Sequence, residues 1–499
     1  MKTTILIGGK AGQGPNLLAN LLSDTLIEDG YYVFNTRDYE SVIRGGHNFN
    51  LVTFSDEPIF SNESKIDVLV CLDDNTEKLH SKDLKKNGII LKGSSENMFY
   101  AGRLFKLFCL PFQTLDNQLK KLGKKYDENI ANAKKGYEDE KKSFCKLEKR
   151  KIKEIKLIGG SKGIADGAIE SGIKFYYAYP MTPATPILFE LAPRQLDVKD
   201  FHTIELESEI AVVMAGLGSA SVGAKTMVGT SGGGFDLMTE GLSMACQAEI
   251  PLILYNASRP GPSTGVATYT GQGDLNMVLY SGHGESFRLV LVPGDPIECQ
   301  EITNQAFYFS EKYKLPSIIL SDKHLSESLY SMEGKPKLVK SENPTELIRY
   351  NSYEHNSTGE ATENAEIIKQ GFEKRIKKEK EIEKEANKFE MFKIYGKKDS
   401  KNLLVSYGST KGAILDAIHN LDIKFIQILY LSPFPQEIEK EIKQAKKVLV
   451  VENNATSPFS DLIKQKICFS IEQKNKILKY DGRPFFSDEL KQEIERRLG

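Results

Sequence analysis

The sequence predicts an α/β protein made of three successive α/β units, and three observations carry this prediction. Apolar, strand-like runs alternate with helical patterns and glycine turns along most of the 499 residues, which is typical of mostly parallel sheets covered by helices. Two polar, lysine-rich stretches divide this alternation into three parts. The chain is also too long for one hydrophobic core, and its length corresponds to roughly three domains of about 150 residues each.

Composition excludes several classes of function. The chain has 40% hydrophobic and 27% charged residues and a net charge of −1, which is typical of a soluble globular protein. Such a balance gives no electrostatic support for a nucleic-acid or anionic-membrane partner. The N-terminal apolar run is too short for a signal peptide, and no later run reaches the length of a bilayer span. We therefore expect a cytoplasmic protein with no nucleic-acid and no membrane partner.

The cysteines argue against a metal or iron–sulfur site on this chain. Zinc knuckles and ferredoxin-type clusters need thiolates grouped closely in sequence, and no two of the six cysteines form a CxxC pair. Scattered single cysteines usually serve as small buried apolar residues. Any iron–sulfur chemistry must therefore lie on another chain. The six are Cys71, Cys109, Cys145, Cys246, Cys299 and Cys468.

The first unit, residues 1–137, opens with the strand TTILI, the glycine loop GGKAGQG and a leucine-rich helix. The loop does not fit the dinucleotide fingerprint, whose third glycine would fall at Leu17, and no Walker A lysine follows it, so an NAD-type oxidoreductase is disfavoured. A plain tight turn explains the loop as well as a phosphate contact does. From about Asp127 the chain becomes polar, which predicts a solvated helix and then a charged linker over residues 138–155.

The second unit, residues 156–345, contains the strands IKFYYAY, PLILYNAS, RLVLVPG and PSIIL. Residues 203–235 add a strand, a helix of small residues, another strand and the glycine loop TSGGGF. Ligands bind parallel sheets at the carboxyl ends of the strands. We therefore expect YPMTP, TSGGGF and SRPGPSTG to lie together at that edge.

The last part of the chain begins with a charged helical connection over residues 346–400. Glu and Lys residues four apart predict an exposed helix there. Residues 401–499 form the third unit, with the strands KFIQILYL and KKVLVVENN.

The stretch YPMTP, residues 179–183, predicts a stiff turn after a strand. Proline fixes its own φ and pushes the residue before it out of the helical region. A rigid loop at a strand end that presents the Thr182 hydroxyl suits ligand positioning. A proline-stapled connection whose hydroxyl caps the next helix is the alternative.

Taken in order, the motifs resemble the alpha subunit of 2-oxoacid:ferredoxin oxidoreductases, in the form with a gamma domain fused ahead of the alpha domain. The resemblance covers nearly the whole chain and implies a gamma domain, a thiamine-diphosphate-type pyrimidine-binding domain and a transketolase C-terminal-like domain for the three units. It rests on GGKAGQG, RGGHN, NIANAKKGYE, YPMTP, ESE-IAVVMAGLGSASVGAK, TSGGGF-DLMTEG, RPGPSTG, QGDL, GHGE, VENN and YDGRPF.

The resemblance implies roles for particular residues. Glu209 would hydrogen-bond N1′ of the cofactor aminopyrimidine, where a carboxyl group drives the tautomer that removes the thiazolium C2 proton. Tyr179 and Pro180 would reach the cofactor, and the Thr182 hydroxyl would point at the reacting carboxylate or carbonyl. Ser231 would line the same cleft. The alternatives are a glutamate that caps its own helix start and a turn hydroxyl at Ser231 that bonds its own backbone.

The chain departs from the family in the stretch TYTGQGDL. Tyr269 stands where a cation for the substrate carboxylate is expected, and Gly271 stands where a glutamate is usual. A neutral phenol cannot replace a charge-assisted contact. Either the positive charge comes from elsewhere, with Arg259 nearby in sequence, or the substrate has an uncharged far end. The second option suits the tyrosine ring better, so we expect weak activity on 2-oxoglutarate.

The chain also lacks a GDG-type diphosphate and magnesium motif. The resemblance implies a separate beta subunit that carries magnesium and the iron–sulfur clusters and shares the thiamine diphosphate. The complex would decarboxylate a 2-oxoacid oxidatively to an acyl-CoA and pass the electrons to ferredoxin, with CoA handled partly by the gamma domain. A non-catalytic interaction or scaffold subunit derived from the family is the alternative, motivated by Tyr269 and Gly271.

Overall fold

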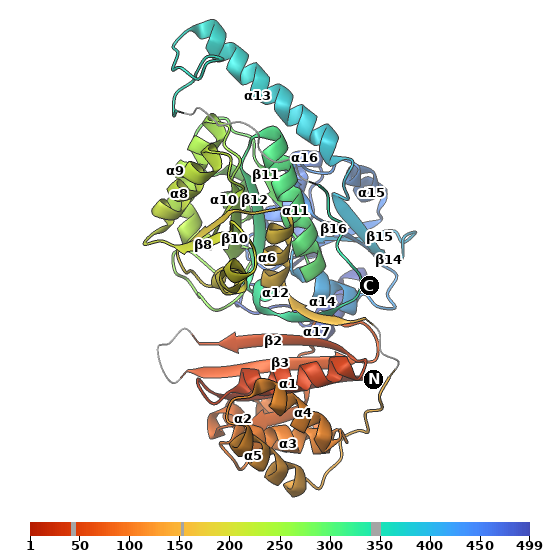
Figure 1. The fold of residues 1–499 in the computed structure, drawn as a ribbon. Coiled ribbons are helices and arrows are strands. Elements are labelled where there is room, and N and C mark those ends of the chain that lie inside the picture. Colours follow the sequence, from red (N-terminus) through yellow and green to blue (C-terminus); the bar gives the residue numbers. More distant parts are fainter. Residues whose placement is uncertain (41–45, 151–153, 341–350) are drawn as a thin grey trace.

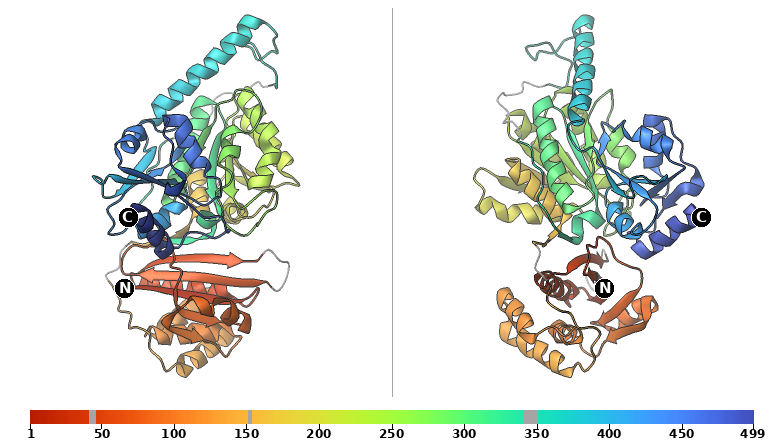
Figure 2. Two further views of the ribbon diagram at one scale, coloured as in Figure 1. Left: turned by 180° about the vertical axis from the view of Figure 1, so that it is seen from behind. Right: turned by 90° about the vertical axis from the view of Figure 1, so that its right-hand side faces the viewer.

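Three β-sheets with flanking helices organise the chain, as the predicted α/β fold class requires. The structure, a computed structural model, describes residues 1–40, 46–150, 154–340 and 351–499. Within these ranges two sheets contain seven strands each and the third contains five. The sheet with the N-terminal strands lies below the other two in Figure 1, and Figure 2 shows the same separation from two further sides.

The first sheet is built around the strand expected from TTILI, which is β1 (Lys2–Lys10). It pairs in parallel with β4 (Ile66–Cys71) and antiparallel with β3 (His47–Ser55). Two strands from the predicted second unit, β13 (Leu329–Met332) and β6 (Lys156–Gly159), extend this sheet and tie the units together. The complete order is β5 (Leu84–Leu91), β4, β1, β3, β2 (Tyr32–Tyr39), β13 and β6.

The loop after β1 turns sharply into the first helix, α1 (Pro15–Glu28). Gly14 has φ 81°, a left-handed conformation that favours glycine. Pro15 follows at the first helical position, where its missing N–H costs nothing. The predicted strand, turn and helix are therefore confirmed. The other helices of this unit are α2 (Asp74–His80), η1 (Ser81–Asp83), α3 (Asn97–Leu107), α4 (Phe112–Leu122) and α5 (Tyr126–Asp139).

The helix predicted from about Asp127 is present as α5, but it is solvated on one side only, because its other side packs directly against α3. A Cβ added at Gly102 would lie 1.9 Å from the Ala133 carbonyl oxygen, and one added at Gly136 would lie 1.8 Å from the Phe99 carbonyl oxygen. Small residues rather than large apolar ones make this contact, so the sequence pattern hid it. Within the predicted linker 138–155, residues 151–153 lie outside the described ranges.

The second sheet is mostly parallel, as predicted. Its central strands are β7 (Phe175–Ala178), β9 (Thr226–Thr230), β10 (Ile253–Ser258) and β12 (Ser317–Asp322), and all neighbouring pairs among them are parallel. One strand from the third unit closes an edge in antiparallel fashion. The order is β17 (Tyr430–Ser432), β11 (Leu289–Leu291), β12, β10, β9, β7 and β8 (His202–Glu205).

Helices connect these strands, and one of them corrects the sequence prediction. TSGGGF was expected to be a glycine loop, but its three glycines form the first turn of α9 (Gly232–Gln247). The helices are α6 (Gly160–Glu170), α7 (Thr185–Leu191), η2 (Ala192–Leu196), α8 (Glu209–Ser221), α9, α10 (Leu275–Tyr280), α11 (Pro296–Tyr313) and α12 (Lys323–Glu327).

The expected charged helix is α13 (Ala365–Ala386), which Asn364 caps by accepting the N–H groups of Glu366 and Ile367. It projects from the end of the molecule opposite to the first sheet (Figures 1 and 2). The range predicted as helical connection also contains the strand β14 (Phe392–Gly396), which pairs with β16 (Lys424–Ile428) of the third sheet. The domain division itself stays a prediction, and its boundary at 345 falls outside the described ranges.

The third sheet has the order β14, β16, β15, β18 and β19. In the part of the chain that the structure describes, no helix is long and apolar enough to cross a membrane. The remaining bounds are β15 (Asn402–Tyr407), β18 (Lys447–Glu452), β19 (Lys476–Leu478), α14 (Thr410–Ala417), α15 (Ile438–Gln444), α16 (Pro458–Ile467), η3 (Gln473–Asn475) and α17 (Ser487–Leu498).

Two carboxylates join the first unit to the third. Asp416 on α14 accepts the backbone N–H of Phe60 and the hydroxyl of Ser61 at 2.6 Å. Asp488 on α17 accepts both the backbone N–H and the hydroxyl of Ser64. Since each carboxylate satisfies two donors of the segment between β3 and β4, these contacts fix the position of the first sheet.

Candidate active site

Glu209 is the first residue of α8, and its carboxyl group is buried. Its exposed fraction is 4%, and among the described residues its Oε1 atom has no hydrogen-bond partner. Ser208 caps the helix instead, with its hydroxyl accepting the Ala211 N–H at 3.3 Å. The helix-cap alternative for Glu209 is therefore weak, because the cap is already filled by Ser208. A buried carboxyl oxygen without a partner is costly in a protein interior and suggests a ligand.

The start of α9 lies against this carboxyl group. A Cβ added at Gly234 would lie 2.6 Å from Glu209 Oε1 and 2.2 Å from Thr230 Oγ1, so only glycine leaves room for the glutamate. Ser231, just before α9, is fully buried, and its hydroxyl has no partner among the described residues. The turn-hydroxyl alternative for Ser231 therefore lacks the hydrogen bond that it requires.

Arg259 follows β10 and reaches the YPMTP turn. Its Nη1 donates to the backbone carbonyl of Thr182 at 2.7 Å, and its side chain is 7% exposed. Burial lowers the pKa of Arg259, and the charges of Asp274 and Glu209 oppose that shift. Arg259 thus orders the turn through its backbone while lying in the field of the buried glutamate. Tyr179, in the same turn, remains 40% exposed.

Asp274, just before α10, is an acid that sequence reasoning did not assign. Its Oδ2 accepts an N–H of the Asn256 side chain at 3.0 Å and lies 3.4 Å from the place of a Cβ on Gly232. Burial raises the pKa of Asp274. The sequence signal available for Asp274 was its place in QGDL, between the glycine motifs RPGPSTG and GHGE. We call Thr182, Glu209, Ser231, Arg259 and Asp274 the glutamate cluster.

Tyr269 lies apart from this cluster, in a cavity of about 420 Å³ between the three units. The Arg483 guanidinium carbon lies 3.6 Å from the centroid of its ring. The neighbouring Thr270 N–H donates to the Gly482 carbonyl at 3.1 Å. We call this cavity the interdomain pocket; its lining includes Asp38, His47, His80, Tyr269, His324 and Arg483.

Two histidines from the first unit face each other in the wall of this pocket. The Nε2 atoms of His47 and His80 lie 2.9 Å apart. Burial lowers the pKa of both, that of His80 to about 4, so the pair is held neutral. Of the motif RGGHN, Arg44 and Gly45 lie outside the described residues.

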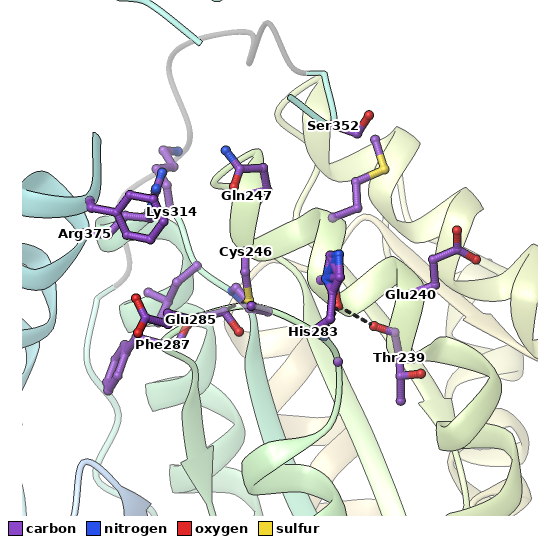
Figure 3. Close-up of a pocket in the computed structure, with 18 of the residues that line it drawn as sticks. Thr239, Glu240, Cys246, Gln247, His283, Glu285, Phe287, Lys314, Ser352 and Arg375 are labelled. Carbon is purple, nitrogen blue, oxygen red and sulfur yellow. Dashed lines mark hydrogen bonds between the residues drawn. The ribbon is translucent and has the colours of Figure 1, made fainter. Parts of the chain in front are cut away.

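A larger cavity, of about 840 Å³, lies beside α13 and the loop that contains His283 (Figure 3). The His283 N–H donates to the Ser243 hydroxyl at 3.2 Å. None of Tyr179, Pro180, Thr182, Glu209, Ser231, Arg259 or Tyr269 lines it. Across the described ranges, no group of three or more His, Cys, Asp or Glu side chains could hold a metal ion.

Comparisons with known proteins identify the family. Residues 166–395 match the family model "Pyruvate flavodoxin/ferredoxin oxidoreductase, thiamine diP-bdg", and residues 4–96 match the model "Pyruvate ferredoxin/flavodoxin oxidoreductase". The 2-oxoacid:ferredoxin oxidoreductase subunit alpha of a Sulfolobus species is 27% identical, with 99% of this chain and 96% of that protein aligned. The 2-oxoglutarate synthase subunit KorA of Methanocaldococcus jannaschii is 29% identical over 68% of this chain and 99% of its own length.

The fold agrees with a solved relative. The 2-oxoglutarate:ferredoxin oxidoreductase of Magnetococcus marinus, solved with 2-oxoglutarate, coenzyme A and succinyl-CoA, superposes with a TM-score of 0.90 at 23% identity, covering 100% of both chains. The sequence motifs agree with the full-length match to the Sulfolobus subunit. The chain therefore belongs to the family of 2-oxoacid:ferredoxin oxidoreductase alpha subunits.

Proposed function

We propose that this chain is the alpha subunit of a thiamine diphosphate-dependent 2-oxoacid:ferredoxin oxidoreductase, which converts a 2-oxoacid, CoA and oxidised ferredoxin to an acyl-CoA, CO₂ and reduced ferredoxin. The observation that carries the proposal is the buried Oε1 of Glu209, which has no partner among the described residues. It lies beside a glycine that leaves room for it and near an arginine that holds the YPMTP turn.

The residues present fit the cofactor. An aminopyrimidine offers a ring nitrogen that needs a carboxyl partner, and Glu209 offers a buried carboxyl oxygen without one. Thiamine diphosphate, when bound, supplies a carbanion and an electron sink for decarboxylation. Glu209 would hold a proton at N1′, and Ser231, Tyr179 and Pro180 would line the cofactor's side of the cleft.

The other members of the glutamate cluster position the substrate. Arg259 ties down the Thr182 carbonyl, so the hydroxyl of Thr182 is presented from a turn with little freedom. Fixed placement matters because misplacing a reacting group by about 1 Å is costly. Asp274 and Glu209 together balance the buried charge of Arg259. The chain's own residues would thus orient the reacting end of the substrate and leave Glu209 Oε1 free to bind the cofactor.

A beta subunit would complete this site. The residues that flank the glutamate cluster expose apolar side chains: Tyr179 is 40% exposed, Ile210 51% and Leu237 49%. Ile210 follows Glu209 directly, and Leu237 lies one turn beyond Gly234 on α9. Apolar side chains grouped around a functional site are typical of a surface that a partner covers. The partner would hold the diphosphate with its magnesium ion and the iron–sulfur clusters, and would pass electrons to ferredoxin.

The test is to assemble the chain with its beta-type partner and compare the wild type with Glu209→Gln. Removing a positioned acid or base typically lowers a rate by about 10²- to 10⁴-fold, and we expect a loss of that size in 2-oxoacid turnover and in hydrogen–deuterium exchange at the cofactor C2. Glu207→Gln is the matched control, because Glu207 is exposed two residues earlier. An unchanged exchange rate in Glu209→Gln removes Glu209 from the proposal.

The same complex tests the scaffold alternative. A partner that brings neither thiamine diphosphate nor clustered cysteines, together with no turnover of any 2-oxoacid, supports a non-catalytic interaction subunit. Turnover that depends on Glu209 supports the enzyme.

A further inference from the structure

Arg483 is a half-buried cation without a close ion-pair partner among the described residues. Among the described residues, no carboxylate lies within 4.0 Å of its guanidinium, and its side chain donates no hydrogen bond. Its neighbour Asp481 does not serve as a partner: Asp481 pairs with Lys479 at 2.9 Å and accepts only the backbone N–H of Arg483. The donors of the guanidinium are therefore available to a ligand.

The structure holds this free guanidinium in one place. It is stacked on the Tyr269 ring, 3.6 Å from the centroid, an arrangement that stabilises arginine through its face and leaves the N–H edge free. The two residues are also fixed through their backbones, because a Cβ on Gly482 would lie 3.3 Å from Tyr269 Cβ and the Thr270 N–H bonds the Gly482 carbonyl. The planar guanidinium N–H donors of Arg483, held in place by the Tyr269 ring, suit a carboxylate.

Four carboxylates, those of Asp38, Glu40, Asp83 and Glu489, line the surrounding pocket, but none of them lies within ion-pair distance of Arg483. The buried carboxylate of Asp38 is already paired with Lys323 at 3.1 Å, and the imidazoles of His47 and His80 are held neutral. Phe49 and Phe485 add apolar surface to the lining. A short apolar chain with a terminal anion matches this combination of groups.

Pro260 lies close to the segment that carries Arg483 and adjoins Arg259 of the glutamate cluster. This residue follows Arg259 in sequence, and its ring lies 3.4 Å from the place of a Cβ on Gly271 and 3.9 Å from that of a Cβ on Gly482. Arg259 in turn holds the turn that contains Thr182. The loop of Arg259 and Pro260 therefore contacts both the YPMTP turn and the segment that carries Arg483.

We propose that Arg483, stacked on Tyr269, binds the distal carboxylate of the 2-oxoacid and makes a dicarboxylic acid the preferred substrate. This inference rests on the proposed function and revises the expectation, drawn from Tyr269 alone, of an uncharged substrate. The positive charge comes from Arg483 in the YDGRPF segment, and the Tyr269 ring supports the guanidinium by stacking. Arg259 is less suited to this role, because it donates to the Thr182 carbonyl and its charge is already opposed by Asp274 and Glu209.

Binding can be tested without turnover. In the complex of this chain with its beta-type partner, calorimetry measures the affinities of glutarate and of butyrate, which differ by one carboxylate. We expect glutarate to bind more tightly, and Arg483→Met to weaken glutarate binding by about 10- to 100-fold while changing butyrate binding by less than about threefold. Arg483→Lys, which keeps the charge without the fork, should fall between. Lys479→Met is the control, because it removes a neighbouring cation that is already paired.

The kinetic arm compares kcat/KM for 2-oxoglutarate and 2-oxobutanoate and the KM for CoA. We expect Arg483→Met to lower only the 2-oxoglutarate value. Equal losses for both acids, or equal binding of glutarate and butyrate to the wild type, overturn the proposal. A raised KM for CoA, with an unchanged ratio of the two kcat/KM values, also overturns the proposal, because Arg483 would then bind a phosphate of CoA. If glutarate binding depends on Arg483 in a complex that shows no turnover, the result supports this proposal. It contradicts only the proposed function.

Discussion

The glutamate cluster and the interdomain pocket are two neighbouring sites assembled in different ways. Every member of the glutamate cluster lies at or soon after the end of a strand in one parallel sheet, or at the start of the helix that follows. The interdomain pocket instead takes His47 from the first unit, Tyr269 from the second and Arg483 from the third. The first site depends on one sheet, whereas the second depends on how three units are docked.

With the roles proposed above, this difference separates chemistry from substrate selection. The groups proposed to act on the reacting centre are held by strand ends and helix starts, whose geometry is set locally. The groups proposed to recognise the far end of the substrate come from loops of separate units, so their placement changes when docking changes. Substitutions in the cluster should therefore affect every substrate, whereas those in the pocket should affect some substrates or only the docking.

The sharpest test of the cluster is Gly234→Ala. The new methyl group would lie 2.6 Å from Glu209 Oε1, so the carboxyl group must move away from its place. We expect turnover to fall by about 10²-fold for all 2-oxoacids, as for other misplaced catalytic groups. Gly233→Ala is the control, since a Cβ there would come no closer than 3.8 Å to another atom. Similar steady-state rates for both variants would show that Glu209 tolerates displacement.

A smaller effect is expected from Arg259→Met. It removes the hydrogen bond to the Thr182 carbonyl and leaves Glu209 and Asp274 without a nearby cation. Loss of a charge-assisted hydrogen bond of about 1.5–3 kcal/mol corresponds to a decrease of about 10- to 100-fold. Steady-state kinetics should show the same decrease in kcat/KM for charged and uncharged 2-oxoacids. A decrease confined to 2-oxoglutarate would move Arg259 into the recognition of the distal carboxylate.

Docking of the first sheet can be weakened through Asp416→Ala, which leaves the Phe60 N–H and the Ser61 hydroxyl without their acceptor. Unpaired buried donors cost about 1–3 kcal/mol. We expect faster hydrogen exchange at the Phe60 amide and a lower unfolding temperature, with the glutamate cluster intact. The control is Asp422→Ala, which removes an exposed ion pair with Lys397 and should change stability little. Equal effects of the two variants would contradict the docking role.

The smallest effect concerns pH and the wall of the pocket. Burial lowers the pKa of His80 from 6.5 to about 4, so the unfolded chain takes up a proton before the folded one does. The stability contributed by neutral His80 is therefore complete above pH 6.5 and is lost as the pH falls from there to about 4. His80→Gln should make the unfolding temperature less dependent on pH across this window. A pH dependence identical to that of the wild type would show that His80 is not the responsible group.

Much of the fold and of the cluster could be predicted from the sequence because the signals are local. Alternating apolar strands and helices predicted the α/β class and the parallel second sheet, and YPMTP, Glu209 and Ser231 were assigned from motifs of a few residues. Local signals failed where small residues make close contacts. The glycines of TSGGGF begin a helix rather than a loop, and Gly102 and Gly136 let α3 and α5 touch where a solvated helix was expected.

The tertiary structure alone decided which distant residues meet. Tyr269 and Arg483 are separated by more than two hundred residues, and nothing in either motif indicates that a guanidinium lies over the phenol ring. Strands β6 and β13 likewise join a sheet that the sequence assigned to the first unit. Hydrophobic periodicity determines which face of an element is buried, but not which partner covers it. The sequence therefore determined the elements and pointed to Glu209 as the candidate acid, and the docking of three units determined that Arg483 faces the pocket.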